Sequence, residues 1–210
     1  MNKTKPDKRK EQGAETKKRL YEIAERLFSS REHIDVSVED ITSEAGITKG
    51  AFYVHFESKD ALIARLIADH AARADMNYRG FLEGLPADLP APAVLLALTE
   101  KIADVLTNTI GRKNMKAVYQ MLLAGTVETQ AVKGYGRELY ALFQGVLEKG
   151  ILRGEIKSAL TAEMLARHLV MAIRGICYEW CIQNEGLDLK KQAVAHIRLL
   201  TEGLGKNAGD

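Results

Sequence analysis

The segment SVEDITSEAGITKGAFYVHFESKDAL, residues 37–62, decides the fold predicted for this chain, because it describes two short helices joined by a tight turn. Ser37 followed three residues later by Asp40 is the pattern of a capping box, which begins a helix. Gly46 can adopt the left-handed backbone that ends a helix at little cost, and Thr48 can cap the helix that follows. The segment therefore predicts a helix-turn-helix.

A longer amphipathic helix is predicted before this segment, over about residues 14–30. Its apolar side chains recur at the spacing that places them on one face of an α-helix: Leu20, Ile23, Ala24, Leu27 and Phe28. Together the three helices form a unit whose last helix can enter the major groove of DNA.

The last helix of the unit has two different faces. Phe52 and Phe56 are four residues apart, so both can pack into the core. The polar side chains left for the outward face are Lys49, Tyr53 and His55. Gly50 and Ala51 lack bulk, which allows the helix backbone to approach base edges closely.

The remainder of the chain is also predicted to be helical. A long helix continues from Ser58 towards Arg79, and a proline-rich loop follows at about residues 84–92. Further helices are expected at about 92–110, 113–125, 129–152, 161–184 and 188–204. Gly134-Tyr135-Gly136 lacks the preceding strand of a dinucleotide fingerprint and is interpreted as a loop or a helix irregularity. The fold class is all-α, with about nine helices.

Composition and charge favour a soluble globular protein. Of the 210 residues, 46% are apolar and 28% are charged, and neither a membrane span nor a signal peptide is recognisable. A cytoplasmic location is expected, with Cys177 and Cys181 as reduced thiols. The first twenty residues carry eight lysines and arginines against three acids. This basic tail could contact phosphates or serve only solubility.

The quoted segment resembles the N-terminal helix-turn-helix signature of the tetracycline-repressor (TetR) family, and the likeness covers about residues 15–66. The resemblance implies a C-terminal helical bundle that binds a ligand and dimerises. The expected organisation is a disordered basic tail over 1–13, a DNA-binding domain over 14–60, a ligand-binding and dimerisation domain over 61–205, and a flexible tail over 206–210.

The resemblance also implies which residues contact DNA. Base edges or phosphates are expected near Thr48, Lys49 and Gly50. Phosphate contacts are expected from Tyr53, His55 and Lys59, with Ser37 and Thr42 as secondary candidates. Two residues depart from the family pattern, because Glu39 stands where many relatives have a basic residue and Val54 stands where many have an aromatic one. An acid at the first position repels phosphate unless it points away.

The last two predicted helices resemble the pair through which the family dimerises. The expected interface residues are Leu165, Ala172, Gly175, Ile176, Tyr178, Val194, Ile197 and Leu200. An ordinary intramolecular core is the alternative for each of them. A two-fold dimer implies a palindromic operator.

A ligand cavity is expected in the central bundle, where methionines can adapt to irregular shapes and polar side chains can orient a mostly apolar molecule. The candidate lining residues are Ile102, Leu106, Met115, Tyr119, Leu122, Tyr140, Phe143, His168 and Met171.

The function predicted is that of a repressor released from its operator by a small, mostly hydrophobic ligand. A constitutive DNA-binding or protein-docking dimer is the alternative. A metal- or thiol-responsive regulator, using His168, Cys177, Cys181 or His196, is a further one. No catalytic constellation is present at usable spacing, so no enzyme, cofactor or resident metal is expected.

Overall fold

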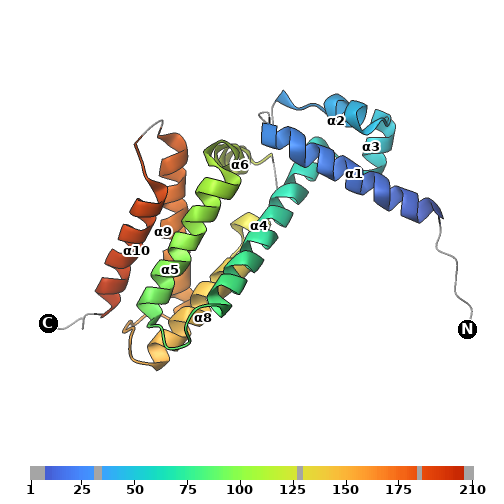
Figure 1. The fold of residues 1–210 in the computed structure, drawn as a ribbon. Helices are drawn as coiled ribbons and strands as arrows, with labels where there is room; N and C mark the ends of the chain where they lie inside the picture. Colours follow the sequence, from blue (N-terminus) through green and yellow to red (C-terminus); the bar gives the residue numbers. More distant parts are fainter. Residues whose placement is uncertain (1–7, 31–34, 127–129, 184–185, 206–210) are drawn as a thin grey trace, which may run out of the picture. The chain divides into compact units, whose positions relative to one another are not determined.

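A computed structural model of the chain describes residues 8–30, 35–126, 130–183 and 186–205. Within these ranges the regular secondary structure is helical throughout, and the all-α prediction is confirmed (Figure 1). None of the helices described is both long and apolar enough to cross a membrane. The predicted tail over 206–210 lies outside the described residues.

The chain divides into two compact units, and the division falls within one helix, between Ile67 and Ala68. The first unit holds α1 (Lys8–Ser30), α2 (Val38–Ala45), α3 (Lys49–His55) and the beginning of α4 (Lys59–Glu83). The division lies beyond residue 60 because Leu62 and Leu66 of α4 belong to the core of the first unit.

Helix α1 begins at Lys8, earlier than the predicted position near residue 14. Residues 8–13 were expected to belong to a disordered tail, and this expectation was wrong. The segment KRKEQG consists mostly of good helix formers, so the helix extends beyond the apolar stripe that marks its core-facing part. Residues 1–7 lie outside the described part of the chain.

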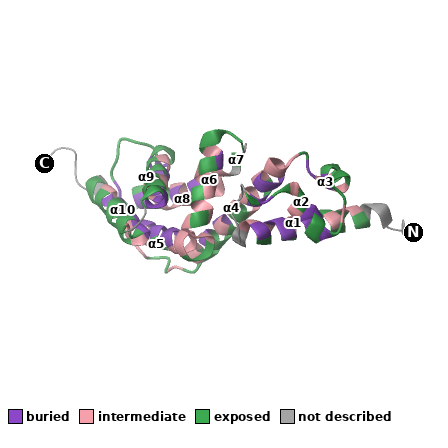
Figure 2. Cartoon of the chain, turned by 90° about the horizontal axis from the view of Figure 1, so that it is seen from above, coloured by how far each residue is buried: buried purple, intermediate pink, exposed green. Residues whose placement is uncertain are grey.

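The core of the first unit contains the apolar stripe of α1, which Figure 2 shows as a line of buried residues. Leu20 and Ala24 are fully buried there, together with Ile41 of α2 and Phe52 of α3. Every helix of the unit thus contributes to one apolar cluster, which holds α3 in place against α1 and α2.

The second unit holds most of α4 and the remaining helices. They are α5 (Ala91–Asp104), the π-helical turn η2 (Val105–Ile110), α6 (Arg112–Ala124, the last residues of which group with the first unit), α7 (Gln130–Lys133), α8 (Glu138–Leu152), α9 (Ala162–Ile182) and α10 (Leu189–Gly205). Helix α9 packs against α8, and α10 packs against both α5 and α9 (Figure 1). The core is built on Leu95, Leu98, Phe143, Leu147 and Leu169.

The helix predicted over 129–152 is broken into α7 and α8 at Gly134-Tyr135-Gly136. A Cβ at position 134 would lie 2.8 Å from the backbone oxygen of Gln130, so the close turn there requires glycine. Helix α8 restarts after Arg137, whose guanidinium binds the buried carboxylate of Asp75 through Nε and Nη2, at 2.6–3.2 Å. This two-point ion pair attaches the start of α8 to α4 within the second unit.

Candidate DNA-binding surface

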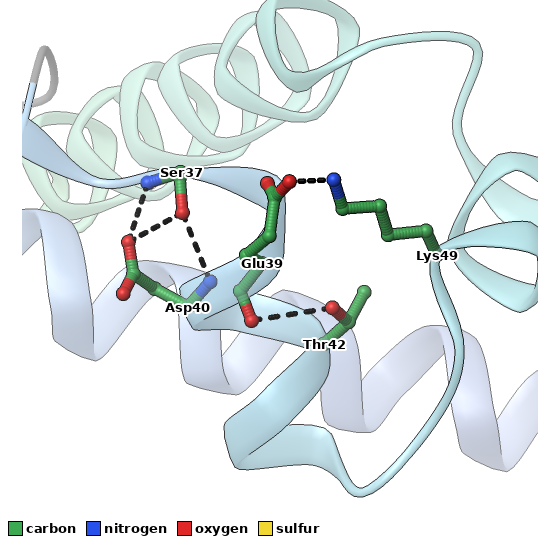
Figure 3. A network of polar contacts seen from close by, with 5 residues as sticks. All are labelled: Ser37, Glu39, Asp40, Thr42 and Lys49. Carbon is green, nitrogen blue, oxygen red and sulfur yellow. Dashed lines mark hydrogen bonds and ion pairs between the residues drawn. The ribbon is translucent and has the colours of Figure 1, made fainter.

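Ser37 begins α2 with a complete capping box, as predicted (Figure 3). Its hydroxyl accepts a hydrogen bond from the Asp40 amide at 3.1 Å and donates one to Asp40 Oδ2 at 2.6 Å. The Ser37 amide donates to the same carboxylate oxygen at 2.8 Å. Because Asp40 already occupies this hydroxyl, a phosphate at Ser37 would have to compete with the cap.

The turn between α2 and α3 also has the predicted form. Gly46 is left-handed, with φ 64° and ψ 34°, and the amide of Ile47 donates to the carbonyl of Thr42 at 3.0 Å. Ile47 packs against the core, and Thr48 Oγ1 accepts a hydrogen bond from the Ala51 amide at 3.2 Å. These contacts fix where α3 starts and which of its faces points outward.

Helix α3 has one buried aromatic face and one exposed face. Phe52 and Phe56 are buried, with ring centroids 5.7 Å apart. Tyr53 is 54% exposed and Val54 is 79% exposed, whereas His55 is partly buried. The edge of the Tyr53 ring meets Phe52 at a centroid distance of 5.3 Å, which directs the tyrosine without covering it.

The side chains of Lys49 and Glu39 form an ion pair that joins the first turn of α3 to the first turn of α2 (Figure 3). Both remain more than half exposed, at 55% and 58%. The carboxylate of Glu39 therefore points at the lysine expected to contact DNA. The acid was recognisable in the sequence as a departure from the family pattern, but its partner was not, because the turn between the helices brings the two together.

Two other expected contacts are less available. Thr42 is only 4% exposed, and its hydroxyl donates to the Glu39 carbonyl at 3.2 Å. Lys59 Nζ donates to the carbonyl of Val36 at 3.0 Å, so this ammonium holds the segment that leads into α2. The exposed expected contacts on α3 and its cap are Thr48, Lys49, Gly50 and Tyr53.

The residues expected to line a ligand cavity are distributed over several places. Ile102, Tyr140 and Phe143 belong to the main core of the second unit, whereas Met115 and Tyr119 pack in a smaller cluster around Trp180. Leu106 contacts both clusters, and Leu122 groups with the first unit. His168 and Met171 are exposed on α9.

The hydroxyl of Tyr119 donates to the carbonyl of Arg174 at 3.0 Å, and burial raises the pKa of Tyr119.

The expected dimer residues also separate into two groups. Leu165 and Ile197 are buried in the core of their own unit, because each lies on the inner face of its helix. Gly175 and Tyr178 are exposed on α9. The others are partly buried: Ala172, Ile176, Val194 and Leu200. Further apolar side chains exposed on these two helices, not named in the prediction, are Met164, Ile182 and Leu199.

Cys177 and Cys181 are both buried with free thiols. A thiol–thiol hydrogen bond with Cys181, together with burial, raises the pKa of Cys177, and the same hydrogen bond lowers the pKa of Cys181. In the described part of the chain, no group of three or more histidines, cysteines and acids is placed to hold a metal ion.

Comparison with known proteins agrees with this geometry. A model of the bacterial regulatory proteins of the tetR family matches residues 20–66. The transcriptional repressor BepR of Brucella suis is 30% identical over 190 residues, which cover 86% of this chain and 87% of that protein. The transcriptional regulator AcrR of Shigella flexneri is 25% identical over 209 residues, covering 93% and 92% of the two chains.

Solved structures share the fold along almost the whole chain. A TetR-family regulator from Pectobacterium atrosepticum has a TM-score of 0.75 at 21% identity, covering 93% of this chain and 97% of its own. FadR of Thermus thermophilus, a repressor solved in complex with lauroyl-CoA, has a TM-score of 0.69 at 19% identity, with 92% and 98% covered.

Proposed function

Because this chain belongs to the TetR family of bacterial regulatory proteins, which are transcriptional regulators, we propose that it is a homodimeric cytoplasmic repressor with a palindromic operator and a small, mostly apolar effector. The observation that carries the proposal is the division of α3 into a buried aromatic face and an exposed face that presents Lys49, Gly50 and Tyr53. An α-helix of this kind fits the major groove of B-DNA, which is about 12 Å wide.

The proposed DNA contacts are on and beside α3. Lys49 is long enough to reach a phosphate or the acceptor edge of a guanine, and Tyr53 presents a phenol suited to a phosphate oxygen. Gly50 and the cap residue Thr48 allow the backbone to come close. His55 remains a secondary contact, because it is partly buried.

Glu39 lowers the positive charge of this surface in the free protein. When Lys49 binds a phosphate, its ammonium leaves the carboxylate oxygen of Glu39 and pairs with a phosphate oxygen instead. This exchange reduces the free energy that Lys49 contributes to DNA binding. It also leaves the carboxylate of Glu39 close to DNA. We therefore propose that Glu39 limits affinity for any duplex and so restricts binding to sites that offer further contacts.

The proposed dimer uses the outward face of α9 together with α10. Exposed apolar side chains follow one another along α9 at helical spacing: Met164, Met171, Tyr178 and Ile182. Leu199 adds an exposed side chain from α10, 68% accessible. Gly175 lies in the middle of this face, and a Cβ there would meet nothing within 4 Å in the same chain. A second helix can therefore approach closely at this point.

An apolar effector is supported by two proteins of the same fold. FadR of Thermus thermophilus was solved with lauroyl-CoA, and FadR of Bacillus subtilis, 19% identical with a TM-score of 0.66, was solved with stearoyl-CoA. Both ligands carry long apolar chains. We propose that this chain responds to a molecule with an apolar part, which shifts the dimer between DNA-competent and incompetent forms.

Selection of bound duplexes from a random library tests the DNA-binding part of the proposal. The expected result is a palindrome whose half-sites are centred about one helical repeat, roughly 34 Å, apart or somewhat further. Recovery of a single unrepeated half-site would contradict the dimeric mode of binding, and recovery of no enriched sequence would contradict specific binding altogether.

A constitutive DNA-binding dimer is the second candidate. It is favoured by the distribution of the expected cavity residues over two clusters and an exposed helix face. Measurement of operator affinity across a library of apolar and amphipathic compounds separates the two candidates. A compound that weakens binding at least tenfold supports the effector-controlled repressor, whereas unchanged affinity throughout supports constitutive binding.

A further inference from the structure

A small cleft lies in the second unit, between the turn that precedes α8 and the beginning of α9. Its volume is about 130 Å³, and its polar lining includes Tyr135, Tyr140, Glu163 and Arg167. This is less than the roughly 300–1,000 Å³ of a site that encloses a whole ligand. The size suits one functional group of a molecule.

Two residues that line this cleft each carry a buried hydrogen-bonding atom without a partner among the described residues. Over the residues that the structure describes, the buried side-chain atoms in this condition are Tyr140 Oη and Arg167 Nε. Both residues line the same cleft. Because a buried donor without an acceptor costs free energy, their coincidence at one place points to a group that supplies the acceptor.

The other contacts of Arg167 hold its guanidinium in a defined position. Its Nη2 donates to Glu163 Oε1 at 2.5 Å, and its Cζ lies over the ring of Tyr135, 4.5 Å from the ring centroid. The Nε–H is therefore a buried donor that neither the ion pair nor the contact with Tyr135 uses. Glu163 is well exposed, so water screens its charge.

Tyr135 contacts both residues that carry the unpaired atoms. Its ring meets Tyr140 edge to face at 5.4 Å and also stacks on Arg167, while more than half of its surface faces solvent. It lies between Gly134 and Gly136, in the turn that separates α7 from α8.

We propose that this cleft binds the carboxylate of a small organic acid, with Tyr140 Oη and Arg167 Nε as donors and Tyr135 as the covering ring. A carboxylate has two oxygens and can accept from both donors at once, and the hydrogen bond from the guanidinium is charge-assisted. The inference rests on the proposed ligand-responsive function and names the chemistry of the ligand's polar end.

Binding of hexanoate to the full-length protein tests the inference, with hexanamide as the neutral probe of equal length and inorganic phosphate as a second anion. Hexanoate is expected to raise the midpoint of thermal unfolding at millimolar concentration. Hexanamide and phosphate are expected to leave it nearly unchanged. Equal effects of the three probes, or no effect of hexanoate, would overturn the proposal.

Two variants locate the site. Tyr140→Phe and Arg167→Lys each remove one donor and are expected to weaken hexanoate binding at least tenfold. Arg112→Lys is the matched control, because Arg112 also stacks on an aromatic ring, that of Trp180, away from the cleft. Hexanoate affinity unchanged in both cleft variants, or lowered equally in the control, would place the carboxylate elsewhere.

Operator binding without any probe separates this inference from the proposed function. If the parent protein binds its operator but hexanoate fails to bind, only the carboxylate site is wrong. If the parent protein selects no operator, the regulatory function itself is wrong.

Discussion

Among single side chains, Lys49 is the one whose removal should weaken DNA binding most. Lys49→Ala is expected to weaken binding to the selected operator at least tenfold and to reduce the salt dependence of binding, because one cationic contact is lost. The fold should be unchanged, since the side chain is exposed. Fluorescence anisotropy over a series of salt concentrations measures both effects.

Lys149→Ala is the matched control for this prediction, because Lys149 is an exposed lysine of α8 in the other unit. It should bind the operator with the affinity and salt dependence of the parent protein. Normal affinity in Lys49→Ala would show that α3 does not use this lysine.

Glu39 is predicted to act in the opposite direction. Glu39→Gln is expected to raise operator affinity about two- to tenfold, because Lys49 no longer leaves a carboxylate and an acid no longer faces phosphate. Surface ion pairs of this exposure contribute little to folding, so stability should change by less than about 1 kcal/mol.

A double-mutant cycle tests whether Glu39 acts through Lys49. In the Lys49→Ala background, the gain from Glu39→Gln should shrink to the part due to direct repulsion of phosphate. A loss of affinity in Glu39→Gln alone would mean that the acid itself contacts DNA favourably, for example by accepting from a cytosine amino group.

At the level of helix packing, α8 offers two glycines with opposite surroundings. A Cβ at Gly150 would lie 2.6 Å from Ala91 Cβ and 2.8 Å from Ile156 Cδ1, whereas one at Gly145 would meet nothing within 4 Å. Gly150→Ala should therefore destabilise the protein by about 1–3 kcal/mol through overpacking against α5. Gly145→Ala should stabilise it by up to about 1 kcal/mol through helix propensity.

Chemical denaturation of the two variants gives the free energies of unfolding. Both substitutions add the same methyl group to the same helix, so their difference reports the close contact of α8 with Ala91 of α5 and with Ile156. A neutral Gly150→Ala would mean that these helices separate easily.

The assembly of two chains is tested at Gly175, in the middle of the proposed dimer face. Gly175→Gln should leave the monomer folded, because its own chain has open space there, but should weaken dimerisation by at least tenfold. Operator affinity should fall with it, since a monomer presents only one α3. Analytical ultracentrifugation across a concentration series measures the change.

Gly80→Gln is the control, because Gly80 is also an exposed helical glycine with nothing within 4 Å of its would-be Cβ. It should dimerise like the parent protein. An unaltered dimer in Gly175→Gln would move the interface away from this part of α9.

The order and type of the helices could be predicted from sequence because they depend on local chemistry. The cap at Ser37, the left-handed Gly46 and the burial of Phe52 and Phe56 were all predicted and are all confirmed. Caps and turns involve residues a few positions apart, and the apolar stripe of a helix repeats along its own length. Such signals can be recognised without knowing what the helix packs against.

Contacts between separate helices depended on the tertiary structure. The pairing of Lys49 with Glu39, the use of Lys59 on a backbone carbonyl, and the burial of Leu165 and Ile197 in their own unit were not predictable from spacing. An apolar helix position is equally suited to an intramolecular core and to a dimer, and only the packed neighbours distinguish them. Sequence therefore determined the helices and the direction in which α3 faces, whereas packing decided which charged and apolar side chains remain available for DNA, ligand and a second chain.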